Sequence, residues 1–299
     1  MAQDLPDTGS RELSLAGALE HVPGFAAGDA VTRMPGGSLN RTYAVRTQAG
    51  EFVVRLTPAT DAWLTTDRSV ERALQAAAAQ AGLAPRLLCA DANDRWSICE
   101  LVAGDPWTAR ELADPECLGR LGDVLRRLHE LPPPDCGRFD LPSALAAYED
   151  RLALASDPNL PLIHAWVQHA AEAWLASGAA RRPATVVHHD LNAANIIAGP
   201  GGLVLIDWEC AAVCDPLLDV ACVLSYYDSA LEHADRLLEH SGLATVERIQ
   251  WQAAVWLFDL HTLLWYWERR YRIAPTAAEE QAAARLAARV NESHAFRSL

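Results

Sequence analysis

One stretch, residues 186–207, constrains the fold of this chain most, because it predicts a strand, a polar loop and a tight β-hairpin in succession. The hairpin consists of two short apolar runs around a Gly-Pro-Gly-Gly sequence, whose composition is typical of a turn. Asn195 stands immediately before the first run and Asp207 immediately after the second. Since a hairpin brings its two ends together, we expect these two side chains to lie close in space.

A third polar side chain belongs to the same stretch. Asp190 lies in the sequence His-His-Asp-Leu-Asn-Ala-Ala-Asn, residues 188–195, directly after the apolar strand. A carboxylate can orient and deprotonate a hydroxyl group, and carboxylate and amide oxygens bind magnesium. We therefore predict that Asp190 acts on a hydroxyl group while Asn195 and Asp207 hold magnesium on the phosphates of ATP. The loop or the hairpin alone would be an ordinary structural feature; their combination in this order favours the catalytic interpretation.

The composition is that of a globular protein with one large or two moderate domains. The 299 residues are 51% hydrophobic and 21% charged, with a net charge of −14. This acidity argues against nucleic acid or an anionic membrane as a partner, because phosphate binding needs clustered cations. It suits a cationic small substrate, although solubility alone would also account for it. The sequence has no signal-peptide pattern and no apolar run near the ~18 residues of a membrane span, so we expect a cytoplasmic protein.

All 25 cationic residues are arginine, so a cationic side chain that binds phosphate must be an arginine here. Arg55 is one candidate. Alternation along the predicted strand of residues 52–56 puts Phe52, Val54 and Leu56 on the core face and Arg55 on the opposite face. The strand alone leaves two possibilities open: Arg55 reaches a phosphate in a cleft, or it is a solvated edge residue.

The hydrophobic pattern of the other residues predicts both strands and helices in the first third of the chain and mainly helices in the rest. In the first third it predicts further strands at residues 42–46, 87–90 and 96–102 and a helix at residues 67–81. The sequence Ala-Gly-Asp-Pro at residues 103–106 breaks the pattern, so we place the boundary between two domains there, as residues 1–103 and 104–299. Beyond it, helices are predicted at residues 117–131, 160–177, 219–227, 230–240, 246–271 and 277–290.

These segments together resemble the aminoglycoside phosphotransferase and choline kinase superfamily, whose fold is similar to that of protein kinases. The chain looks closest to bacterial choline kinase-like and thiamine kinase-like members. The resemblance is carried by the turn at residues 36–40, the strand at 52–56, the motifs at 188–195 and 206–209, and the acids Asp215 and Asp219. It implies an α+β, two-lobed fold. A small N-terminal lobe has an antiparallel sheet and one helix, and a larger, mainly helical C-terminal lobe contains the catalytic β-hairpin.

The resemblance also implies a role for individual residues. Asp190 is the catalytic residue that orients and deprotonates the hydroxyl group, and Asn195 and Asp207 are the magnesium ligands. His188, Glu209 and Asp219 support them. The nucleotide, ATP or alternatively GTP, is bound by the following positions: Gly37, Ser38, Arg55, Glu71, Glu100 and Val102. Glu71 falls where the family has the helix acid that pairs with the phosphate-binding cation, although an exposed helix acid is the commoner fate of a glutamate.

The acceptor side of the site departs from the pattern of choline and thiamine kinases. Cys210 stands where they usually have tyrosine, and Tyr226 stands where they usually have an acid. We take the acceptor pocket to contain Tyr226, Asp228, Trp265 and Trp267, because aromatic faces and acids attract organic cations. Tryptophans at helical spacing are, however, more often part of a core.

Three functional hypotheses follow. The first is a kinase that transfers the γ-phosphate of ATP to a hydroxyl group of a small molecule, with choline, ethanolamine or thiamine as cationic candidates. The second is an antibiotic kinase of the aminoglycoside type. The third, a non-catalytic kinase-like binding domain, is disfavoured because Asp190, Asn195 and Asp207 are all present. The sequence does not indicate an oligomeric state.

Overall fold

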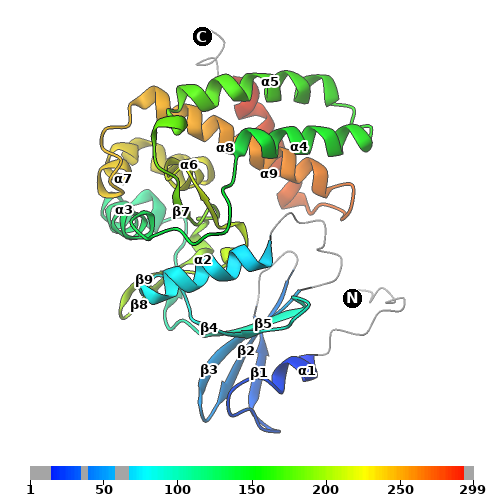
Figure 1. Cartoon of the computed structure of the whole chain (residues 1–299), viewed down its shortest axis with the longest axis vertical. Coiled ribbons are helices and arrows are strands. Elements are labelled where there is room, and N and C mark those ends of the chain that lie inside the picture. Colours follow the sequence, from blue (N-terminus) through cyan, green and yellow to red (C-terminus); the bar gives the residue numbers. More distant parts are fainter. Residues whose placement is uncertain (1–14, 35–39, 58–66, 293–299) are drawn as a thin grey trace.

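The computed structural model describes residues 15–34, 40–57 and 67–292, and the predicted nucleotide residues Gly37 and Ser38 lie outside these ranges. The N-terminal part contains a five-stranded antiparallel sheet in the order β1-β2-β3-β5-β4 within the described residues (Figure 1). Its strands are β1 (Ala30–Arg33), β2 (Arg41–Thr47), β3 (Gly50–Leu56), β4 (Leu87–Ala90) and β5 (Trp96–Glu100). The predicted strands are confirmed, and a short helix, α1 (Leu15–Leu19), packs against β3.

Strand β3 has the two-faced character that its alternation predicts. Phe52, Val54 and Leu56 are buried in a small core on one side of the sheet. Arg55 points to the other side, towards helix α2 (Arg68–Gln80). Asp67 caps this helix by accepting a hydrogen bond from the Ser69 amide at 2.8 Å. The helix lies between the sheet and the helical part of the molecule (Figure 1), so its side chains can contact both.

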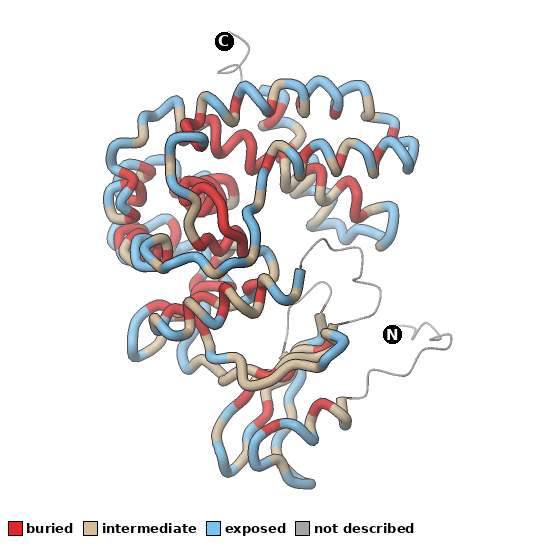
Figure 2. Tube along the Cα trace, viewed as in Figure 1, coloured by how far each residue is buried: buried red, intermediate tan, exposed pale blue. Residues whose placement is uncertain are grey.

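The C-terminal part is largely helical, as predicted. Its central helix, α8 (Arg248–Arg269), packs against four other helices and contributes to two apolar clusters of the core. Figure 2 shows that buried residues concentrate in the interior of this part and exposed ones along its outer helices. The remaining helices are α3 (Pro115–His129), α4 (Leu141–Leu154), α5 (Leu160–Ala176), α6 (Leu217–Tyr226), α7 (Ala234–His240) and α9 (Ala277–Glu292). In the described residues, no helix is both long and apolar enough to cross a membrane.

The predicted hairpin is confirmed as β8 (Ile196–Gly199) and β9 (Gly202–Leu205). Strand β7 (Thr185–Val187) comes directly before the loop of residues 188–195, which connects it to the hairpin. It pairs with β10 (Ala212–Cys214). The predicted helix at 230–240 is wrong over its first residues. A 3-10 turn, Asp228–His233, occupies them because helix α6 ends where Tyr227 becomes extended, with φ of −131°.

The chain between the sheet and the helices runs in contact with this hairpin. Strand β6 (Asp105–Pro106) pairs with β8, and Gly104 has a φ of 137°. A Cβ atom on Gly104 would lie 2.3 Å from the carbonyl oxygen of Ala198, and one on Gly199 would lie 2.6 Å from that of Ala103. Both positions therefore need glycine for two backbones to approach this closely. The predicted α+β class, an antiparallel sheet followed by a mainly helical part, is confirmed.

Candidate active site

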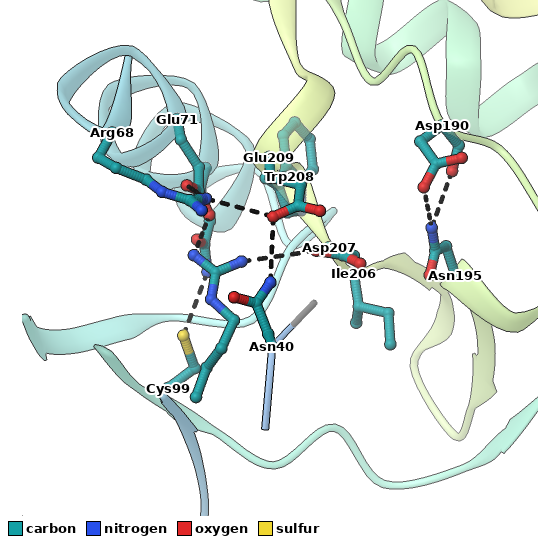
Figure 3. A network of polar contacts seen from close by, with 12 residues as sticks. Asn40, Arg68, Glu71, Cys99, Asp190, Asn195, Ile206, Asp207, Trp208 and Glu209 are labelled. Carbon is teal, nitrogen blue, oxygen red and sulfur yellow. Dashed lines mark hydrogen bonds and ion pairs between the residues drawn. The ribbon is translucent and has the colours of Figure 1, made fainter. Parts of the chain in front are cut away.

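The open end of the hairpin brings together the polar residues that the sequence motif singles out. The Ile206 amide donates to the carbonyl oxygen of Asn195 at 2.9 Å, so Asn195 and Asp207 both lie at this end. The amide nitrogen of Asn195 donates to the Asp190 carboxylate at 2.8 Å and to the Asp190 carbonyl oxygen at 3.0 Å. Figure 3 shows Asp190 and Asn195 facing each other beside Asp207. Three segments of the motif therefore converge on one spot.

The loop that carries Asp190 is fixed from below by Asp219 and His188. Asp219, on α6, is fully buried and accepts hydrogen bonds from the His188 and His189 amides and from the His129 ring at 2.9 Å. Burial alone would raise the pKa of Asp219, but the hydrogen bond from His129 and its charge more than compensate and lower it. Asp219 is therefore an anion around which the loop backbone is arranged.

The His188 ring links the loop to the hairpin. Its Nε2 lies 2.9 Å from the Ile206 carbonyl oxygen, and its Nδ1 accepts from the Asp190 amide at 3.3 Å. Burial lowers the pKa of His188 despite the nearby carboxylates. These contacts require a neutral ring with the proton on Nε2. The His188 side chain therefore contacts the backbone of Asp190 itself and that of Ile206, the residue directly before Asp207.

Two residues at the site have the left-handed backbone conformation that side chains other than glycine rarely adopt. His189 has a φ of 65° and Asp207 a φ of 64°. Such conformations cost about 1–3 kcal/mol each and persist where surrounding contacts impose them. They place Asp190 at the end of its strand and Asp207 at the end of the hairpin, facing the same region.

The acidity of the two aspartates reflects their surroundings. Burial raises the pKa of Asp190, although hydrogen bonds from Asn192 and Tyr226 act in the opposite direction. Burial, followed by the charge of Glu209, raises the pKa of Asp207 to about 7. The Asp207 side chain is nevertheless 39% exposed, so a ligand can reach it. An accessible carboxylate among other carboxylates attracts a divalent cation.

Arg55 faces these acids from the sheet. Its guanidinium group is ion-paired with Glu71 of α2 and lies 3.5 Å from the Asp207 carboxylate. Glu71 is 3% exposed rather than solvated. Burial would lower the pKa of Arg55, but the charges of Glu71 and Asp207 more than compensate and raise it. Arg55 is therefore a fixed cation at the open end of the hairpin.

The residues present fit a magnesium ion shared with a nucleotide. Within the described residues no group of three or more histidines, cysteines, aspartates and glutamates forms a metal site. Magnesium bound to a nucleotide requires fewer protein ligands, because phosphates and water complete its coordination. Asn195 and Asp207 supply an amide and a carboxylate at one end of the hairpin.

Comparison with known proteins decides the family. The profile described as the phosphotransferase enzyme family matches residues 30–252, which include both the sheet and the β8–β9 hairpin. The chain belongs to this phosphotransferase family. The predicted enzyme class, a small-molecule kinase, is confirmed at the level of this family. No curated protein matches the sequence.

Solved structures share the fold of this phosphotransferase over nearly its whole length. A choline/ethanolamine kinase family protein from Mesorhizobium loti is 22% identical, with 94% of this chain and 95% of that chain covered and a TM-score of 0.75. LicA, a choline kinase from Streptococcus pneumoniae, was solved with AMP and is 15% identical over 94% and 99% of the chains, with a TM-score of 0.74. A macrolide 2'-phosphotransferase from Brachybacterium faecium is 21% identical over 91% and 97%, with a TM-score of 0.63.

The phosphotransferase brings one predicted acceptor residue into contact with Asp190. The Tyr226 hydroxyl donates to Asp190 at 3.1 Å. Asp228 lies apart, is 65% exposed and contacts Arg289 at 3.3 Å. Trp265 is half-buried beside Tyr266, whereas Trp267 is buried against Trp166 in the core. Tyr226 is therefore the predicted acceptor residue that directly touches Asp190.

Two further predicted nucleotide-binding residues, Glu100 and Val102, lie where the sheet ends. Glu100 closes β5 and pairs with Arg86 at 2.5 Å, with both side chains largely exposed. Val102 follows in the link and is half-buried. Their position between the sheet and the hairpin is compatible with contact to a nucleotide base.

Sequence reasoning missed several residues of the site. Asn192 donates to both Asp190 carboxylate oxygens at 3.3–3.4 Å, and the Tyr227 hydroxyl accepts from the Ala193 amide at 2.7 Å. Asn192 stands inside the motif and could have been found there. Arg68, which contacts Glu71 at 2.6 Å and Glu209 at 3.3 Å, carries no motif at all.

Proposed function

We propose that this phosphotransferase transfers the γ-phosphate of ATP, in the presence of magnesium, to a hydroxyl group of a small molecule. The convergence of Asp190, Asn195, Asp207 and Arg55 at the open end of the hairpin carries this proposal. The AMP complex of LicA, which has the same fold, supports a nucleotide as the donor. GTP remains an alternative donor, since nothing in the link between the two parts selects adenine.

Each residue has a distinct part in the proposed reaction. Asp190 accepts a hydrogen bond from the acceptor hydroxyl and takes its proton as the oxygen attacks phosphorus. Asn195 and Asp207 would hold magnesium, which neutralises charge on the transferred phosphoryl group. Arg55, fixed by Glu71, would bind the remaining phosphates with its planar guanidinium group.

Our first candidate for the acceptor is a cationic alcohol such as choline, ethanolamine or thiamine. The choline kinases among the proteins of similar fold support it, as do the aromatic rings of Tyr226 and Tyr266. The neighbouring acids already have partners: Glu279 pairs with Arg269 at 2.9 Å, and Asp228 with Arg289. Recognition of the cation would therefore depend on aromatic faces more than on a free carboxylate.

An aminoglycoside or a macrolide is the second candidate, because a macrolide 2'-phosphotransferase also shares the fold. The two candidates are separated by a screen of the purified protein with ATP and magnesium against choline, ethanolamine, thiamine, sugars, homoserine and antibiotics of both classes. Release of ADP and a new phosphorus signal in ³¹P NMR would identify the product. If no alcohol is phosphorylated and ATP binding does not depend on magnesium, the proposed function is wrong.

Arg55→Ala is expected to raise KM for ATP by roughly 10–100-fold, because it removes charged hydrogen bonds to phosphate worth about 1.5–3 kcal/mol. The KM for the acceptor should stay within about twofold. Steady-state kinetics with each substrate varied in turn measure both. Arg46→Ala, which removes an exposed arginine that pairs with Glu51 on the neighbouring strand, is the matched control. Equal effects on the two KM values would contradict the role of Arg55.

Tyr226→Phe is expected to lower kcat by about 10-fold with little change in KM for ATP, because the phenol is one of the donors that orient the Asp190 carboxylate. Tyr271→Phe serves as a control, since the Tyr271 hydroxyl donates to Asp157 at 2.9 Å, outside the site. A rise in KM for the acceptor at unchanged kcat would instead mean that Tyr226 contacts the acceptor and not the base.

A further inference from the structure

Glu209 connects the helical part of the molecule to the N-terminal part. It lies two residues after Asp207, in the 3-10 turn Trp208–Cys210. Its carboxylate oxygen Oε2 accepts from the side-chain amide of Asn40 at 3.1 Å and from the Arg68 guanidinium group at 3.3 Å. Asn40 directly precedes strand β2, and Arg68 is the first residue of helix α2. A residue next to the metal-binding aspartate is therefore bound by two elements of the N-terminal part (Figure 3).

Helix α2 contacts the site through two of its residues, Arg68 and Glu71. Arg68 donates to Glu71 at 2.6 Å as well as to Glu209, and Glu71 is also the partner of Arg55. The side chains are well shielded from water, with 13% of Arg68, 3% of Glu71 and 20% of Glu209 exposed. Ion pairs with this degree of shielding interact more strongly than pairs at the surface. The position of α2 is thus linked to the phosphate-binding cation and to the segment that contains Asp207.

The backbone of Asp207 needs such external support. Its left-handed conformation is unfavourable for an aspartate, so the residues on both sides must hold it. The next residue, Trp208, is buried and donates from its indole nitrogen to the Leu205 carbonyl oxygen at 2.9 Å. Glu209 supplies the second anchor, through Asn40 and Arg68.

The side-chain amide of Asn40 uses its nitrogen to contact Glu209, which leaves its oxygen to be considered. Its side-chain oxygen is buried and has no hydrogen-bond partner among the residues that the structure describes. Buried polar atoms without partners are uncommon and costly in folded proteins, by about 1–3 kcal/mol.

We propose that Arg68 and Asn40 are positioning residues that act through Glu209 to keep Asp207 in the conformation that binds the metal ion. This inference rests on the proposed function, because it takes Asp207 as a magnesium ligand. It assigns Arg68 an effect on magnesium affinity, although Arg68 itself does not contact the metal ligand.

A double-mutant cycle of Arg68→Ala and Glu209→Ala tests this coupling. Calorimetric titration of magnesium into the protein with a non-hydrolysable ATP analogue measures the apparent magnesium affinity without relying on turnover. Each single variant should weaken the apparent magnesium affinity about 10-fold. This is the lower end of the loss that typically follows when a residue supporting a metal ligand is mutated. If the two residues act through one contact, the double variant should lose about 10-fold as well. A loss near 100-fold, or unchanged affinity in Arg68→Ala, would overturn the proposal.

Two further variants serve as a control for Arg68→Ala and as an independent test of the proposal. Arg72→Ala removes an arginine from the next turn of α2 that pairs with Asp94 in the N-terminal part, and its magnesium affinity should be unchanged. Asn40→Ala removes the second anchor of Glu209 without touching α2 and should weaken magnesium by several-fold, which covers the case in which Arg68→Ala does not fold. A matching loss in Arg72→Ala would show a general effect of α2 and reject the specific link.

The same titration on Asp207→Ala distinguishes a failure of the metal assignment of Asp207 from a failure of the positioning role of Arg68 and Glu209. If Asp207→Ala binds magnesium with the nucleotide as the unmodified protein does, the metal assignment fails. If Asp207→Ala loses the magnesium dependence while Arg68→Ala and Glu209→Ala retain full affinity, only the positioning role fails.

Discussion

Asp190→Asn is expected to reduce kcat by about 10²–10⁴-fold, the range typical of a lost general base. Asparagine has the shape of aspartate, so its side chain can remain in contact with Asn192 and Tyr226, but it cannot take up a proton. Nucleotide binding should therefore stay within a few-fold of that of the unmodified protein. Single-turnover measurements with the acceptor in excess, together with calorimetry of nucleotide binding, distinguish these two quantities.

A suitable control for this substitution is Asp150→Asn, which changes an exposed aspartate on α4. Its activity should equal that of the unmodified protein. Retention of more than a tenth of kcat in Asp190→Asn would remove Asp190 from the proton-transfer step. The reaction would then depend on positioning and charge alone.

Asp207→Ala is expected to abolish transfer and to remove the magnesium dependence of nucleotide binding. A metal ion stabilises the developing charge by several kcal/mol, so its loss should reduce the rate on the order of 10³-fold or more. Asp207→Asn removes the charge but tolerates the left-handed backbone better than alanine does. It separates the loss of the ligand from a rearrangement of the turn. Nucleotide affinity measured with magnesium and with a chelator provides the test.

The matched control for Asp207 is Asp94, which also has a left-handed backbone, with φ of 57°, and also pairs with an arginine. Asp94→Ala should leave the magnesium dependence intact. The pH dependence gives a second check. With the pKa of Asp207 raised to about 7, protons compete with magnesium below that pH, so magnesium-dependent nucleotide binding should weaken as the pH falls from 8 to 6. A flat profile over this range would contradict the assignment.

The hairpin and the faces of strand β3 could be predicted because their signals are local. Two apolar runs around a glycine-rich turn specify their own pairing, and a period of two specifies the side from which Arg55 projects. Helix α4 was missed although its signals are present. Asp140 caps its start, and Leu141, Leu145 and Leu152 recur at helical spacing. The short apolar strand before the Asp190 loop was predicted and is confirmed as β7, whereas β10, with three residues, is too short to show any periodicity and was missed.

The network around Glu209 could not be predicted for a different reason. Arg68 and Glu209 are 141 positions apart in the sequence, and Asn40 and Glu209 are 169 apart. Glu209 and Asn40 belong to segments that the family resemblance singles out, but no local pattern marks Arg68 or the pairing of these residues, because their contacts are set by the packing of α2 between the two parts of the molecule. The chemistry of Asp190, Asn195 and Asp207 is visible in the sequence, whereas the contacts that orient them arise only in three dimensions.

The link between the two parts of the molecule is in contact with the hairpin. With Gly104 pressed against the backbone of Ala198, and Gly199 against that of Ala103, the link is fixed to strand β8 from Gly104 onward. Within the link, only residues 101–103 lie between β5 and this contact, a segment shorter than one turn of helix. The sheet is held a second time through helix α2, which contacts the turn Trp208–Cys210, so both connections between the two parts lie against the segments that carry Asn195 and Asp207.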